Sequence, residues 1–73
     1  MPAEPLVPHI PVTPFQLRVL RRVAAGLTAA EIATELDFSH SHIKKTLAQA
    51  RVALGARNLA HAVALAFREG FIT

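Results

Sequence analysis

The sequence of 73 residues contains no cysteine, tryptophan or tyrosine. Without cysteine the chain can form neither a disulfide nor a zinc site built on thiolates. Aromatic residues make up only 5% of the chain although 52% of it is hydrophobic, so its apolar side chains are chiefly alanine, leucine, valine and isoleucine. This composition favours closely packed helices over a β-sandwich.

Long apolar runs are also missing. No uncharged stretch approaches the 18 or so residues that a membrane span requires. The start, Met1-Pro2-Ala3-Glu4, has no basic region followed by an apolar stretch, as a signal peptide would. We therefore expect a soluble, cytoplasmic protein, and at this length a single domain.

Acidic residues are absent from one long segment of the chain, between Asp37 and Glu69. The basic residues of that segment are Lys44, Lys45, Arg51, Arg57 and Arg68. The net charge of the chain is only +3, but the concentration of basic residues in this segment predicts an anionic partner there.

Capping signatures predict where four helices begin. A polar side chain able to cap a helix precedes each apolar periodic segment, and in the first two a Gln or Glu three residues later can complete a capping box. The predicted caps are Thr13, Thr28, Ser39 and Asn58. Only Asp37 and Phe38 separate the second helix, over about residues 29–36, from the third. No strand pattern appears, so the expected fold class is all-α.

The helix after Ser39 has two different sides. Its apolar stripe consists of Ile43, Leu47, Ala50 and Leu54, and the opposite side carries Ser41, Lys44, Lys45, Ala48, Gln49 and Val52. Two helices joined by a short turn, the second with small polar and basic side chains, are typical of a DNA-binding helix-turn-helix. The alternative is that the lysines only form a solvated helix face.

Several motifs occur in order along residues 12–66. They are Gly26-Leu27-Thr28, Glu31-Ile32-Ala33, Ser39, Ile43-Lys44, Leu54-Gly55, Asn58 and Ala62-Val63. In this combination the chain resembles the LuxR-type (GerE-type) helix-turn-helix family, and less closely region 4 of sigma factors. It departs from the LuxR-type pattern at Asp37, where glycine is usual, at His42 and Thr46, and at Gln16 near the start of the first helix.

The resemblance implies a four-helix, LuxR-type helix-turn-helix domain, which we place over residues 12–73, and the proline spacing predicts an extended proline-rich arm over residues 1–11. It implies a sequence-specific transcription regulator whose helix after Ser39 enters the major groove of double-stranded DNA. Because eleven residues are too few for a sensor domain, we expect a free-standing regulator. The expected DNA contacts are Thr28, His40, Ser41, His42, Lys44, Lys45, Ala48, Arg51 and Arg57.

The last predicted helix is apolar nearly all round, which favours a partner helix. We expect a homodimer through this helix, with Leu59, Val63 and Ala66 near the two-fold axis and the two recognition helices reading a pseudo-palindromic site. The alternative is that the C-terminal apolar residues fold back on the body or on the proline-rich arm; they are Leu65, Phe67, Phe71 and Ile72.

The proline-rich arm has prolines at every third position from residue 2 to residue 14, the repeat of a polyproline II helix. It is either a weakly ordered leader or a docking strip that packs Leu6, Val7 and Ile10 on the body or on another chain.

Metal binding and catalysis find little support in the sequence. His40 and His42 are two residues apart at a helix start, which points them to different sides, and no carboxylate joins them at ligand spacing. We expect no metal, no cofactor and no enzyme activity. The rival function is a protein-interaction module that uses the same scaffold to bind RNA polymerase or another regulator.

Overall fold

The computed structural model of the chain describes residues 11–73, which fold into four α-helices. They are α1 (Pro14–Ala24), α2 (Ala29–Leu36), α3 (His40–Leu54) and α4 (Leu59–Arg68). No strand occurs between residues 11 and 73, so the expected all-α fold is confirmed. The proline-rich arm that we predicted over residues 1–11 lies outside the described residues, except for Pro11.

All four predicted caps are N-caps in the structure. At α1 the Gln16 amide donates to the Thr13 hydroxyl at 3.1 Å, and the Thr13 amide donates to the Gln16 side-chain oxygen, also at 3.1 Å. Gln16 thus closes the capping box in the same way as a glutamate would. Thr28 and Glu31 form the second box at α2.

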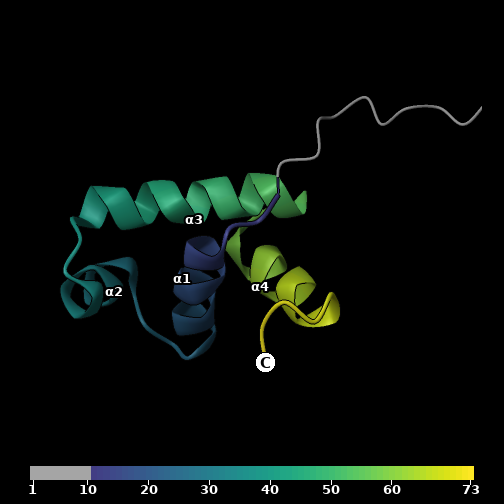
Figure 1. Cartoon of the computed structure of the whole chain (residues 1–73), viewed down its shortest axis with the longest axis horizontal. Coiled ribbons are helices and arrows are strands. Elements are labelled where there is room, and N and C mark those ends of the chain that lie inside the picture. The colour runs from purple at the N-terminus through teal and green to yellow at the C-terminus, as the bar shows by residue number, and fades with distance from the viewer. Residues whose placement is uncertain (1–10) are drawn as a thin grey trace, which may run out of the picture.

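The longest helix, α3, lies along one side of the molecule and packs against α1, α2 and α4 (Figure 1). One side of α3 therefore faces the rest of the protein, and the other is left open. The predicted stripe is confirmed, because Ile43, Leu47 and Ala50 are buried and Leu54 is half-buried against the core.

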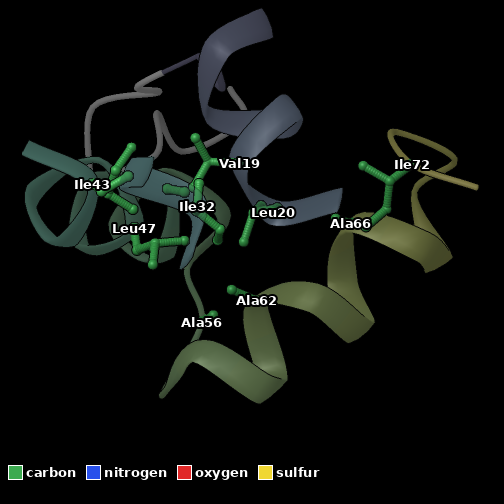
Figure 2. Close-up of a cluster of buried hydrophobic side chains, with 11 residues drawn as sticks. Val19, Leu20, Ile32, Ile43, Leu47, Ala56, Ala62, Ala66 and Ile72 are labelled. Atoms are coloured by element: carbon green, nitrogen blue, oxygen red, sulfur yellow. The ribbon is translucent and has the colours of Figure 1, made fainter. Parts of the chain in front are cut away.

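Large side chains from the first three helices fill the centre of the core. Val19 and Leu20 of α1, Ile32 of α2 and Ile43 of α3 are fully buried and lie close together with Leu47 (Figure 2). The fully buried residues of α4 are instead two alanines, at positions 62 and 66. Alanines let α4 approach the core closely but bury little apolar area.

The C-terminal residues fold back over the end of α4. The amides of Phe71 and Ile72 both donate to the Ala66 carbonyl, at 2.8 and 3.3 Å, and Ile72 is only 2% exposed. The alternative of a fold-back thus holds for Ile72, whereas Phe67 and Phe71 remain exposed. Ala66 is 0% exposed, so our expectation that it lies at a dimer interface is wrong, because its side chain is already enclosed by its own protomer.

No helix among residues 11–73 is long and apolar enough to cross a membrane.

Candidate nucleic-acid interface

The turn between α2 and α3 depends on a left-handed residue. Asp37 caps α2 with φ 60° and ψ 44°, the single non-glycine residue with positive φ in the described part of the chain. Aspartate tolerates this region better than most residues because its short polar side chain can bond locally. The chain therefore makes the sharp change of direction into α3 without the glycine usual at this position.

The open side of α3 carries the predicted basic face. Ser41, Lys44, Lys45, Ala48 and Gln49 are all exposed, as is Val52. None of the described carboxylates pairs with these lysines, because the one ion pair among residues 11–73 joins Arg22 of α1 to Glu35 of α2, at 3.0 Å. Within residues 11–73 the two ammonium groups therefore have no carboxylate partner.

The N-terminus of α3 adds further donors next to the lysines. The Ser39 hydroxyl accepts from the His42 amide at 3.1 Å and lies 3.5 Å from the Ser41 hydroxyl. His40 and Ser41 are exposed at the first two helical positions, where backbone N–H groups have no partner within the helix. These groups and the helix dipole favour negative charge at this end.

His42 takes part in an aromatic cluster that the sequence did not reveal. Its ring stacks on Phe38 of the turn, with centroids 4.9 Å apart and planes at 17°, and Phe38 in turn contacts Phe15 of α1 at 5.1 Å. The cluster joins α1, the turn and α3. We expected His42 to contact a phosphate, and the structure gives its ring a packing role as well.

Thr28 is exposed at the start of α2, but most of its polar groups are occupied. Its amide donates to the Glu31 carboxylate at 2.8 Å, and its hydroxyl oxygen accepts from the Glu31 amide at 3.2 Å. The hydrogen bond from the Thr28 amide to the Glu31 carboxylate, and to a smaller extent the interaction of the Thr28 side chain with that carboxylate, lower the pKa of Glu31 below its ordinary 4.5. The carboxylate therefore stays charged beside Thr28, and a phosphate bound by the Thr28 hydroxyl would lie close to that negative charge.

The two arginines expected to contact the DNA backbone differ in their surroundings. Arg51 is half-buried, and its Nη1 donates to the Ala56 carbonyl at 2.9 Å, while the Ala56 amide donates to the Arg51 carbonyl at 2.9 Å. Arg51 thus fixes the loop from α3 to α4. Arg57 is exposed, and its backbone amide donates to His61 Nδ1 at 3.1 Å. Its guanidinium has no partner among the described residues.

Thr46 is a second feature that sequence reasoning missed. It is buried, and its hydroxyl donates to the His42 carbonyl at 2.9 Å, so its polar group is satisfied within α3. Its position, three residues after Ile43 and four before Ala50, places it on the apolar stripe, a signal that its polar side chain obscured. Its burial means that this departure from the LuxR-type pattern alters the inner side of α3 rather than the open side.

The outer side of α4 is apolar. Ala60, Ala64 and Phe67 are exposed, and Leu59 and Val63 are half-buried at the edge of the core. The two remaining residues of the expected dimer interface, Leu59 and Val63, therefore keep part of their surface open. Among residues 11–73 there is no group of three His, Asp or Glu residues that could hold a metal ion.

These features place a basic helix face, a tight turn and an apolar fourth helix in one small domain. A family model described as bacterial regulatory proteins, luxR family (GerE), matches residues 11–66, which is more than half of the chain. No curated protein sequence shows significant similarity to the chain. The family match covers all of α1, α2 and α3 and most of α4. The chain therefore belongs to the LuxR family of bacterial regulatory proteins.

Proposed function

We propose that the chain is a transcription regulator that binds duplex DNA by inserting α3 into the major groove. One observation carries the proposal: Ile43 and Leu47 hold α3 against the core while Lys44 and Lys45 are exposed on its open side. An α-helix with its side chains fits the width of the major groove of B-DNA. Membership of the LuxR family supports the same function.

The residues of α3 divide between two kinds of contact. Ser41, Lys44, Lys45 and Ala48 are proposed to reach base edges, because they share the open side over the first nine residues of the helix. Ala48 offers only a methyl group, which suits the methyl group of thymine.

The proposed phosphate contacts surround that face. They are the exposed side chains of His40, His42 and Arg57, the Thr28 hydroxyl proton, and the donors of Arg51 that do not bond to Ala56. Arg57 is the strongest of these candidates, because its guanidinium is exposed and has no described partner.

We further propose a homodimer through the outer side of α4. Its support is the apolar surface formed by Ala60, Val63, Ala64 and Phe67, with Leu59 at the edge. A two-fold dimer would bring two copies of α3 to one duplex. Ala66 has no part in this interface, for the reason given above.

A titration of a labelled duplex at two salt concentrations tests the proposal. Binding through phosphates releases counterions, so affinity should fall steeply as salt rises, with a slope of about −0.9 for each phosphate neutralised. The matched control is the variant Lys44→Gln with Lys45→Gln, which keeps unbranched polar side chains and removes both charges. Salt-insensitive binding, or equal binding by the control variant, would refute the proposal.

A protein-interaction module remains the second candidate function. The exposed Phe67 and the small net charge of +3 favour it. In the same titration this module would show no salt-dependent affinity for any duplex. Its partner would instead cover the outer side of α4, so substitution of Phe67 would weaken that complex while substitution of Lys44 would not.

A further inference from the structure

An open groove of about 640 Å³ lies beside α3, on the side of the helix that carries Lys45. Its walls come from the start of the described chain, at Pro11 and Thr13, and from Lys45, Ala48 and Val52 of α3. Val52 is 52% exposed, although it is a large apolar residue on a side that otherwise carries polar and basic groups. An apolar side chain packed against Val52 would remove more apolar surface from water than a phosphate or a base edge would.

The groove has a candidate occupant in the same chain. Residues 1–10 are joined directly to its wall at Pro11, and they include the apolar residues Leu6, Val7 and Ile10. A segment tethered at the edge of a site has an effective concentration in the millimolar range, so weak contacts suffice for substantial occupancy. The prolines restrict the unbound segment, which lowers the entropy that it loses on binding.

Charge and length agree with this occupant. Residues 1–10 contain one acidic side chain, Glu4, and no lysine or arginine, so Glu4 complements the charge of Lys45. Ten residues in polyproline II conformation reach about 31 Å. The wall of the groove from Lys45 to Val52 spans eight residues of helix, a rise of about 10 Å.

A second hollow, of about 350 Å³, also includes Pro11. It lies between the ends of α3 and α4 and is lined by Leu54, Leu65 and Phe71, but Glu69 also lines it. The Glu69 carboxylate would repel Glu4, whereas the Lys45 ammonium in the larger groove attracts it. The larger groove is therefore the better match.

We propose that residues 1–10 occupy the groove beside α3 and compete there with DNA for Lys45 and Ala48. The competition rests on the proposed function, whereas the contact between the segment and the groove does not. If the segment fills the groove in 70–90% of molecules, the apparent DNA affinity falls about 3- to 10-fold relative to molecules with an open groove.

A spin label on the full chain tests the contact. Since the chain has no cysteine, Ala3→Cys provides a single attachment site for a nitroxide. We expect selective paramagnetic broadening of the amide signals of Ala48, Gln49 and Val52. The amides of Ala30 and Thr34 on α2 serve as internal controls, and reduction of the nitroxide should restore every signal. Addition of duplex DNA should remove the broadening.

A variant of the segment tests the competition. Leu6→Ser, Val7→Ser and Ile10→Ser together should abolish most of the broadening and tighten duplex binding about 3- to 10-fold, as the open groove becomes the main state. These substitutions lie outside the four helices and the core described above.

Four outcomes would overturn the proposal. The first is uniform broadening of all amide signals. The second is broadening centred on the amides of Leu65 and Phe71, because the segment would then fill the smaller hollow. The third is broadening seen only when spin-labelled chains are mixed with isotope-labelled chains, which would make the occupant a second copy. The fourth is an unchanged duplex affinity in the triple variant, which would overturn the competition. Failure of the wild-type chain and of every variant to bind duplex would refute the proposed function instead. The broadening would still show whether residues 1–10 contact the groove.

Discussion

Helices α3 and α4 pack against the same core through side chains of different size. α3 inserts Ile43 and Leu47, whereas the fully buried residues of α4 are Ala62 and Ala66. Burial of a large aliphatic side chain contributes about 1.5–3 kcal/mol, and an alanine contributes much less. The protomer therefore holds α3 in a fixed orientation, while α4 gains less from its own core.

The outer sides of the two helices differ in the opposite sense. α3 presents lysines and small polar groups, and α4 presents Ala60, Ala64 and Phe67. The first surface is suited to a hydrated, charged ligand, and the second to another apolar surface. A short chain can thus combine two kinds of interface when one helix turns its large apolar side chains toward the core and another turns them outward.

The beginnings of the two helices also invite comparison. Both carry a histidine three residues after the N-cap, at positions 42 and 61, and both histidines contact the residue that precedes the cap. His42 stacks on Phe38, and His61 Nδ1 accepts a hydrogen bond from the Arg57 amide. One sequence spacing thus gives a stacked ring at α3 and a polar capping contact at α4.

The largest expected effect concerns the inner sides. Ile43→Ala should lower the free energy of unfolding by about 2–5 kcal/mol because it leaves a cavity, and Ile43→Val should lower it by about 0.5–1.5 kcal/mol. At α4 the harmful change is the reverse one, since Ala62→Leu should overpack the core at a cost of about 1–3 kcal/mol. Urea unfolding followed by circular dichroism measures all three. Tolerance of Ala62→Leu would show that α4 is not closely packed.

The next effect concerns the outer side of α3. Lys44→Ala should weaken duplex binding by about 1–3 kcal/mol and relax discrimination between sequences, if Lys44 reads a base. Arg57→Ala should weaken binding to all sequences alike and reduce the salt slope by about 1. Titrations of two duplexes at several salt concentrations separate the two patterns. Unchanged binding in both variants would show that α3 does not enter the major groove of DNA.

A smaller effect is expected on the outer side of α4. Phe67→Ser should raise the dissociation constant of the proposed dimer about tenfold, which corresponds to about 1.4 kcal/mol. The free energy of unfolding should change little, because Phe67 is 47% exposed. Sedimentation equilibrium measures the dimer, with Ala30→Ser on α2 as control. A wild-type chain that stays monomeric at tens of micromolar, both free and with DNA, would contradict the dimer.

The smallest expected effect separates the two histidines. His42→Phe keeps a ring to stack on Phe38, so the free energy of unfolding should stay within about 0.5 kcal/mol. His61→Phe removes the acceptor of the Arg57 amide and should cost about 0.5–1 kcal/mol, since water can replace part of that bond. Urea unfolding again gives both values. Equal losses at the two positions would show that the two contacts do not differ in kind.

Local signals in the sequence were enough to predict where the helices begin. Each of the four caps bonds to an amide three residues away, so the spacing alone identifies it. The two sides of α3 were equally predictable, because its lysines and its apolar stripe alternate with a helical period.

Features that depend on tertiary contacts were not predictable. The cluster of His42, Phe38 and Phe15 needs α1 to approach the turn, and no spacing within one helix encodes that approach. Ala66 was assigned to the wrong side because α4 is apolar almost all round, so hydrophobicity alone could not tell its inner alanines from its outer ones. The bond from Arg51 to Ala56 was hidden because arginine ordinarily indicates an exposed position.

The two hydrogen bonds that join Arg51 to Ala56 have a consequence for operator geometry. They fix the connection between the helix proposed to read DNA and the helix proposed to pair with a second protomer. In a two-fold dimer this connection would set the separation of the two reading helices, which must match one turn of B-DNA, about 34–36 Å. Loss of the Arg51 side chain would then relax the required distance between half-sites, even where affinity for a single half-site is retained.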